Sequence, residues 1–269
     1  MCDESASSMI KDSLSPAAIT ANLETRFIGQ KIIYYPRLTS TMDVARRVAR
    51  QGAIEGTVVV ADEQTVGKGR VKRVWLSPRG SIALSLILHP DTSCLSDLIV
   101  LSSLAVARSL KAVTGLEAQI KWPNDILVRG RKVCGILVEN DWREKRVAYA
   151  IIGIGINVNF RLADFSGILP EATSLVDEIG KEVSRLDLVR ALFTEMERLY
   201  LALPGGDSIY REWRTRLVTL GRKVRVESGQ TILEGIAESV ARDGSLLLRH
   251  PDGSSTRIVT GDVHLRNDE

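Results

Sequence analysis

The sequence has few cysteines and few histidines. Its three cysteines, Cys2, Cys94 and Cys134, are odd in number, widely spaced and part of no C-x-x-C pattern. This spacing argues against a disulfide framework and against a structural zinc site. The three histidines are scattered without ligand spacing and are interpreted as surface or strand residues. We therefore predict a cytoplasmic protein whose thiols stay reduced.

Long apolar runs and a strong net charge are also missing. No run in the 269 residues approaches the roughly 20 apolar residues of a membrane span, and the first residues lack the cationic and apolar regions of a signal peptide. Thirty-six Lys and Arg against 33 Asp and Glu leave a net charge of only +3. This mild excess is not typical of a DNA-binding surface. We expect neither a membrane nor DNA as a partner.

The common nucleotide-binding motifs are absent. No G-x-x-x-x-G-K-[ST] sequence occurs. The dinucleotide fingerprint fails as well, because Gly67-x-Gly69 has Lys72 in place of the third glycine and the pair that begins at Gly153 has Val158 there. If the chain binds a nucleotide, it does so without a Walker loop or a Rossmann site.

Alternating strand and helix patterns follow a polar tail that extends to about residue 28. Predicted strands cover residues 31–35, 57–62, 81–88, 125–128, 133–140 and 147–159, of which the last three form an antiparallel meander. Predicted helices cover residues 40–52, 95–115, 187–203 and 208–217. Ser40 and Asp43 are predicted to form a capping box, and Gly115 ends the second helix.

The pattern changes near residue 218. Five short strands separated by "SG", "RDG", "PDG" and "GD" turns predict a small barrel. We predict a tail at 1–28, a catalytic domain at 29–217 and a barrel domain at 218–267.

A basic, glycine-containing loop follows the strand at 57–62. Within residues 62–80 stand Gly67, Lys68, Gly69, Arg70, Lys72, Arg73 and Trp75. The glycines allow the backbone to approach a ligand closely, the cations can neutralise phosphate, and the indole can stack on a planar ring. The alternative is a basic loop that is merely solvated.

A second polar cluster frames a predicted hairpin. Lys121, Asn124 and Asp125 lie at one end of it and Lys132 near the other. A carboxylate and two lysines beside a phosphate-binding loop suggest metal-assisted chemistry at phosphorus. The alternative is a charged hairpin around a buried Trp122.

Four segments in this order resemble the biotin protein ligase family: "DEQTVGKGR", "KWPNDI", "RKVCGILVE" and "IGIGINVN". The resemblance extends from about residue 29 to 267. It implies an α+β fold, a mixed sheet with helices like that of class II synthetases and lipoate ligases, followed by an SH3-like barrel. It also implies that biotin and MgATP form biotinyl-5′-AMP, from which biotin passes to a lysine of the biotin carboxyl carrier protein of a carboxylase.

The resemblance assigns roles to individual residues. The biotin-binding set is Ser40, Thr41, Met42, Gln64, Gly67, Lys68, Gly69, Arg70, Lys132 and Gly153. The ATP and adenylate set is Lys68, Arg70, Trp75, Asn124, Lys132 and Asn157. Arg70, Lys132 and Asp125 are the expected catalytic residues, and Asp125 is the candidate Mg²⁺ ligand.

Three positions depart from the family pattern. Lys68 replaces an arginine and loses its bidentate fork, Lys72 replaces a glycine of the loop, and Met42 replaces an asparagine. Cys134 lies in an apolar run and is interpreted as a core residue, not as the thioester nucleophile of the related octanoyltransferases.

Alternatives remain at the level of the whole protein. A lipoate or octanoate ligase of the same fold is the rival enzyme, and an adaptor built on the barrel is the rival without enzymatic activity. About 28 residues before the catalytic domain are too few for a winged three-helix domain, so we expect no operator binding. A homodimer formed through the edge of the meander is left open.

Overall fold

The main body of the molecule is a mixed sheet, seen in a computed structural model that describes residues 12–165 and 171–266. Its strands lie in the order β1 (Ile32–Tyr35), β2 (Val58–Ala61), β5 (Ile82–Leu88), β9 (Arg146–Ile156), β8 (Arg131–Arg143), β7 (Asp125–Val128) and β6 (Ala118–Lys121). β1 and β2 are parallel and the other neighbours are antiparallel. The predicted strand–helix–strand unit and the predicted meander β7–β8–β9 are both confirmed.

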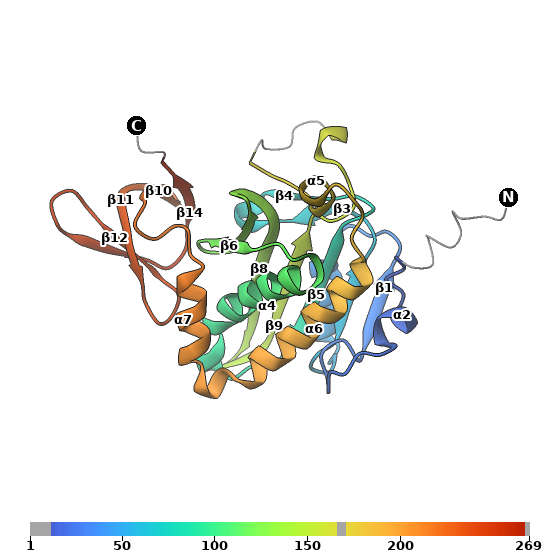
Figure 1. Ribbon diagram of the computed structural model, residues 1–269. Coiled ribbons are helices and arrows are strands. Elements are labelled where there is room, and N and C mark those ends of the chain that lie inside the picture. Colours follow the sequence, from blue (N-terminus) through green and yellow to red (C-terminus); the bar gives the residue numbers. More distant parts are fainter. Residues whose placement is uncertain (1–11, 166–170, 267–269) are drawn as a thin grey trace.

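Helices cover both faces of this sheet. α4 (Asp97–Thr114) and α6 (Arg185–Leu201) lie side by side on one face, next to α7 (Asp207–Thr215) (Figure 1). On the other face, α3 (Thr41–Arg50) packs on β2, β5 and β9 in an apolar cluster of its own. Every residue of the central strand β5 is buried. Burial on both faces explains why this strand is apolar along most of its length.

The predicted helix ends are partly correct. Gly115 ends α4 in the left-handed conformation, with a φ of 75°. The predicted capping box on α3 is wrong, because the side chain of Ser40 accepts no capping hydrogen bond. Gln64 caps this helix from another strand, since its Oε1 accepts from the Thr41 amide at 2.8 Å. A contact of this kind between distant residues has no local signature in the sequence.

A small antiparallel sheet, here called the barrel, forms the other part of the molecule (left in Figure 1). It consists of β10 (Lys223–Ser228), β11 (Thr231–Val240), β12 (Leu246–Arg249), β13 (Ser255–Ile258) and β14 (Asp262–Leu265), in the order β13-β12-β11-β10-β14. The five strands predicted from the turn signals are confirmed, and the barrel has the SH3-like character that was expected.

The segment before β1 packs against the main body. It contains the short helix α2 (Pro16–Thr20), and the side chains of Leu14, Ile19 and Ile28 are fully buried. Glu197 of α6 accepts hydrogen bonds from three successive backbone amides, those of residues 26, 27 and 28, at 2.6, 2.9 and 3.0 Å. From residue 12 onward, the part predicted as a polar tail therefore contributes to the core.

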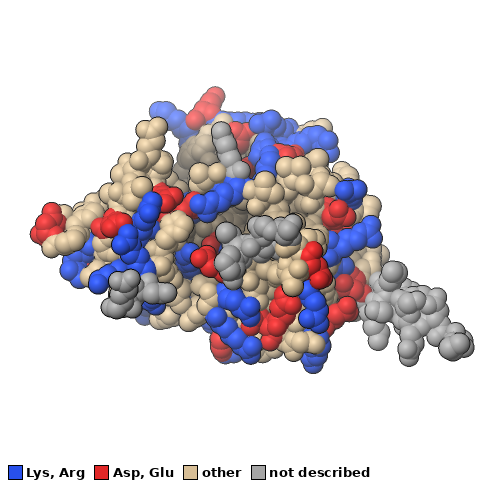
Figure 2. Space-filling model, turned by 90° about the horizontal axis from the view of Figure 1, so that it is seen from above, with Lys and Arg blue, Asp and Glu red and all other residues tan. Residues whose placement is uncertain are grey.

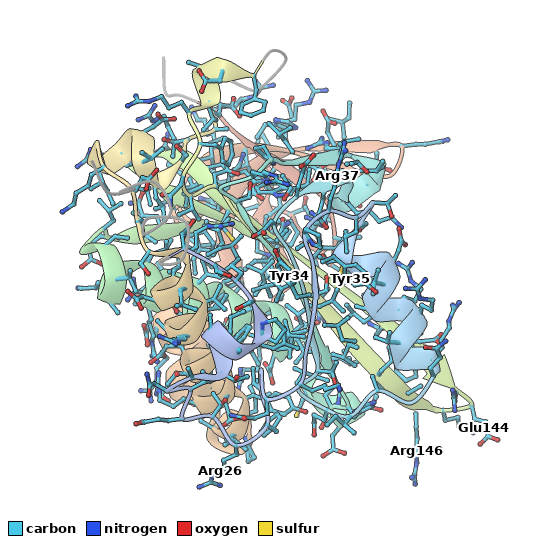
Figure 3. The ribbon with its side chains drawn as sticks, turned by 90° about the vertical axis from the view of Figure 1, so that its right-hand side faces the viewer. Arg26, Tyr34, Tyr35, Arg37, Glu144 and Arg146 are labelled. Atoms are coloured by element: carbon cyan, nitrogen blue, oxygen red, sulfur yellow. The ribbon has the colours of Figure 1, made fainter. Side chains whose placement is uncertain are left out.

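The far side of the sheet ends in a strand and a protruding hairpin (Figure 3). Tyr34 and Tyr35 lie on the edge strand β1, and the hydroxyl of Tyr34 donates to Asp62 at 2.5 Å. Glu144 and Arg146 lie at the tip of the β8–β9 hairpin and point away from the body. No helix among the described residues is long and apolar enough to cross a membrane.

Candidate active site

The basic loop lies at the end of a separate two-stranded ribbon, β3 (Gln64–Lys68) and β4 (Val74–Ser77). The amide of Gly69 donates to the carbonyl of Arg73 at 2.8 Å and closes the loop. Val71 between them has a φ of 51°, which is strained for a β-branched residue. The loop therefore has a defined conformation that its surroundings must stabilise.

Arg70 connects this loop to the barrel. Its Nη1 donates to Asn124 Oδ1 at 3.1 Å and to the Gly261 carbonyl at 3.2 Å, and its Nη2 donates to Thr260 Oγ1 at 2.9 Å. Burial lowers the pKa of Arg70, whereas the charges of Asp262 and Asp125 act to raise it. Arg73 adds an ion pair with Asp262 at 2.8 Å. These contacts contradict the alternative of a basic loop that is merely solvated.

The β7–β8 hairpin brings the second polar cluster to the same place. Lys132 Nζ lies 2.6 Å from Asp125 Oδ1 and 5.4 Å from the centre of the Trp75 ring. The side-chain amide of Asn124 donates to the Ile136 carbonyl at 2.8 Å, which fixes the turn that precedes β7. Trp122 is buried as expected, but the hairpin also carries a lysine–carboxylate pair toward the loop. Lys132 and Asp125, predicted to lie at opposite ends of the hairpin, thus form an ion pair and line the same cavity.

Two paired glycines form a floor beneath Trp75. Gly135 of β8 lies opposite Gly155 of β9. A Cβ atom on Gly155 would lie 2.3 Å from Trp75 Nε1, and one on Gly135 would lie 3.1 Å from the same indole. Only residues without a side chain let the ring lie so close to the sheet. The Trp75 N–H lies against this floor and has no hydrogen-bond partner among the described residues.

Thr41 and Gln64, two residues of the predicted biotin-binding set, are in contact. Thr41 Oγ1 donates to Gln64 Oε1 at 3.1 Å and accepts from Ser85 Oγ at 2.8 Å. Ser40 and Met42 are buried nearby, and Met42 Sδ would lie 2.7 Å from a Cβ atom on Gly153. Met42 packs in the apolar cluster between α3 and the sheet.

These elements enclose one cavity of about 630 Å³. Most of the predicted site residues line it: Thr41, Gln64, Lys68, Gly69, Arg70, Trp75, Asn124, Asp125, Lys132, Gly153 and Asn157. Ser40, Met42 and Gly67 are not part of its lining. Seen from the top of Figure 1, the surface is hollowed, with Lys and Arg side chains beside the hollow (Figure 2).

The barrel contributes residues that the sequence did not point to. Asp262, Val263, His264 and Leu265 of β14 line the same cavity. In the sequence, Asp262 follows Gly261 and reads only as part of a turn. No pattern relates it to a loop about 190 residues earlier, so only the fold could identify it.

Asn157 follows the end of β9 and is almost fully buried. Its side-chain amide donates to the Thr173 carbonyl at 2.9 Å, and its backbone amide donates to Val133. The residue therefore fixes the segment at 171–173 against β8, where Glu171 and Ala172 also line the cavity.

The cysteine and metal predictions can be compared with the described residues. Cys134 is fully buried and burial raises the pKa of its thiol, so it is a poor nucleophile. This agrees with its interpretation as a core residue. Within residues 12–165 and 171–266, no group of three or more His, Cys, Asp or Glu residues is arranged to hold a metal ion.

Comparisons with known proteins agree with this geometry. A model described as "Biotin/lipoate A/B protein ligase family" matches residues 34–157, and one described as "Biotin protein ligase C terminal domain" matches residues 219–266. The bifunctional ligase/repressor BirA of Bacillus subtilis is 37% identical over 258 residues, which cover 94% of this chain and 79% of that protein. The biotin–[acetyl-CoA-carboxylase] ligase of Mycobacterium tuberculosis is 31% identical over 273 residues, covering 95% and 99%.

A solved structure shows the same fold. The biotin protein ligase from Aquifex aeolicus in complex with biotin and ATP has a TM-score of 0.72 and 27% sequence identity, and the match covers 89% of this chain and 100% of that one.

Proposed function

Because this chain belongs to the biotin protein ligase family, we propose that its cavity binds biotin and ATP and joins biotin to a lysine of a carrier protein. The observation that carries the proposal is the convergence of Lys68, Arg70, Lys132 and Trp75 on one cavity. Its volume of about 630 Å³ lies within the roughly 300–1,000 Å³ of small-molecule sites. The three cations can neutralise the carboxylate of biotin and the phosphates of ATP, and the indole can stack on the adenine ring.

The first step requires two anions to meet. An oxygen of the biotin carboxylate attacks the α-phosphorus of ATP, and pyrophosphate leaves with the electron pair of the broken P–O bond. Lys68, Arg70 and Lys132 carry the positive charge that offsets the repulsion between carboxylate and phosphate. Because these cations are fixed by ion pairs and hydrogen bonds, little reorganisation is needed as charge develops.

The second step transfers the acyl group. The amine of the carrier lysine attacks the carbonyl carbon of the mixed anhydride, AMP leaves with the electron pair of the C–O bond, and the amine proton passes to solvent. The intermediate must be protected from water until the carrier arrives. The loop from Gly69 to Arg73, held against the barrel by Arg70, is placed to cover it.

Magnesium belongs to this proposal as a companion of ATP. Asp125 is the candidate carboxylate, although its Oδ1 lies 2.6 Å from Lys132 Nζ. One carboxylate with phosphate oxygens and waters is a normal Mg²⁺ environment, so the residues present fit an ion that arrives with the nucleotide. When bound, the ion would supply charge that stabilises the leaving pyrophosphate. Asp125 orients Lys132 and would be the residue that holds the ion.

The rival substrate is a lipoyl or octanoyl group, since one matching family model covers both biotin and lipoate ligases. The match to the C-terminal domain of biotin protein ligases favours biotin. We further propose that the acceptor is the carrier domain of a biotin-dependent carboxylase, that the protein works in the cytoplasm, and that any homodimer forms through the edge of the meander.

The test is to incubate the protein with a biotin carboxyl carrier domain, ATP and Mg²⁺, together with either biotin or lipoate. Streptavidin and an anti-lipoyl antibody would report the two products on separate blots. The proposal expects labelling with biotin that depends on ATP. Labelling with lipoate alone would favour the rival enzyme, and no labelling with either would leave the cavity without the proposed chemistry.

A further inference from the structure

Lys68 lies on the rim of the cavity, but its charge is already paired. Its ammonium donates to Asp43 Oδ1, on the first turn of α3, in a short hydrogen-bonded ion pair. Asp43 is not part of the cavity lining, whereas Lys68 is. A cation that lines the cavity is thus paired with a carboxylate outside the cavity lining.

Asp43 is itself fixed in place. Arg46 Nη1 donates to the same Oδ1 atom at 2.7 Å, and Arg46 Nη2 donates to Glu139 of β8. Burial alone would raise the pKa of Asp43, but hydrogen bonds from Lys68 and Arg46 together with their charges lower it. Asp43 is therefore a permanent negative charge at neutral pH.

The local fold makes this carboxylate available. Gln64 at the start of β3 accepts the amide of Thr41, and the side chain of Ser40 makes no capping hydrogen bond on this helix. Asp43 instead reaches the other end of β3, where Lys68 stands. Both ends of the strand that carries the basic loop are attached to the first turn of α3.

We propose that Asp43 is an internal counter-ion that sets, and lowers, the affinity of the cavity for the carboxylate of biotin. The inference rests on the proposed function, because it takes Lys68 as the cation that meets that carboxylate. The argument is electrostatic: an anion that approaches Lys68 must share the ammonium with a negative charge already in contact with it. Removing that charge while keeping the side-chain shape strengthens the binding of the anion.

The expected gain in biotin affinity is limited by the solvent exposure of the Lys68–Asp43 ion pair. The side chains of Lys68 and Asp43 are 38% and 40% exposed, and exposed ion pairs contribute at most about 1 kcal/mol. Asp43→Asn is thus expected to tighten biotin about three- to fivefold. This gain in affinity arises from charge, so it should be absent for a ligand that carries no charge.

The experiment measures equilibrium binding of biotin and of biotinol, its uncharged alcohol analogue, in the absence of ATP. Isothermal titration of Asp43→Asn should show tighter biotin and unchanged biotinol, and the gain should shrink as salt is added. Asp187→Asn is the matched control, because Asp187 also lies in the first turn of a long helix and is exposed. That variant should bind both ligands like the parent protein.

A second variant tests whether Lys68 mediates the effect. In a Lys68→Gln background, Asp43→Asn should no longer change biotin binding, since the cation that Asp43 offsets is gone. Circular dichroism of each variant checks that it is folded.

The remaining outcomes of the binding experiment would each contradict the proposal. Weaker or unchanged binding of biotin to folded Asp43→Asn would overturn the inference, and so would an equal gain for biotin and biotinol. If the parent protein bound neither ligand, the proposed function would fail first, which separates the two failures.

Discussion

Lys132 stands where the three chemical parts of the cavity meet. Its ammonium contacts the carboxylate of Asp125 and lies over the ring of Trp75, and its Cε atom lies beside Gly135 of the glycine floor. A lysine has three donors, so pairing with one carboxylate leaves two for a ligand. The residue can therefore be oriented and active at the same time.

Replacing Lys132 by alanine should slow adenylate formation about 30- to 1,000-fold, equivalent to roughly 2–4 kcal/mol, because a charge-assisted donor is lost where charge develops. Pyrophosphate release measures this step. Lys145→Ala, in the exposed β8–β9 turn, is the control and should behave like the parent. Unchanged release in Lys132→Ala would place this residue outside the chemistry.

Gly155→Ala should raise the KM for ATP more than that for biotin. The added methyl group would meet the indole of Trp75 at 2.3 Å and force the ring to move, and base–aromatic stacking contributes about 1–3 kcal/mol. Steady-state kinetics with each substrate varied in turn gives both values.

The double variant Gly155→Ala/Trp75→Ala provides the check on this explanation. It should be no worse than Trp75→Ala alone, because the glycine matters only through the indole. Additive losses would show that the methyl group disturbs something else.

The site was predictable where its residues are close in sequence or share a strand pattern. Lys132 and Asp125 meet because a tight hairpin brings them together, and the turn signal at residues 129–130 indicated that hairpin. Asp262 was missed because its contact with Arg73 depends on how the barrel packs. Met42 was assigned to the biotin-binding set by family position; its side chain packs against Gly153 in the apolar cluster of α3 and is not part of the cavity lining.

Among the elements, α6 does more than cover the sheet. The carboxylate of Glu197 accepts three backbone amides of the segment before β1, which belongs to no helix or strand at those residues. This arrangement supplies acceptors for groups that would otherwise be buried without partners. The composition of the segment suggested a tail because its polar residues mask three widely spaced apolar anchors, Leu14, Ile19 and Ile28.

Glu197→Ala should lower the free energy of unfolding by roughly 2–4 kcal/mol, since it leaves backbone amides unsatisfied in a buried place. Chemical denaturation followed by circular dichroism measures the change. Glu197→Gln keeps one acceptor oxygen, so its free energy of unfolding should lie between that of Glu197→Ala and that of the parent protein.

Exposed Glu182 offers the control for this series. Glu182→Ala should stay within about 0.5 kcal/mol of the parent. Equal stability of Glu197→Ala and the parent would mean that the segment is held by its apolar anchors alone.

At the scale of the whole molecule, residues of the main sheet, the ribbon and the barrel all line the cavity. The main sheet supplies the glycine floor and Lys132, the ribbon supplies the basic loop, and the barrel supplies Asp262 and its neighbours on β14. Arg73 joins the loop to Asp262 at 2.8 Å. The position of the barrel therefore determines where the loop lies.

Asp262→Asn should loosen the loop and let biotinyl-AMP escape. The adenylate reacts with exposed lysines without the enzyme, so labelling of a bystander such as serum albumin should rise relative to labelling of the carrier domain. Streptavidin blots of both proteins from one incubation give the ratio. Asp252→Asn, in an exposed turn of the barrel, is the control, and an unaltered ratio in Asp262→Asn would contradict the role of this contact.

Trp122 has a consequence for how the molecule melts. Its indole N–H donates to the Gly244 carbonyl of the barrel at 2.8 Å, and its backbone amide donates to Thr219 Oγ1. One continuous apolar cluster contains Trp122 and Ile120 together with Val224 and Leu246 of the barrel. Because the two parts share an apolar core, they should unfold together. A calorimeter should then record one unfolding transition whose van't Hoff and calorimetric enthalpies agree. In thermodynamic terms, we expect the barrel and the main sheet to unfold as a single cooperative unit.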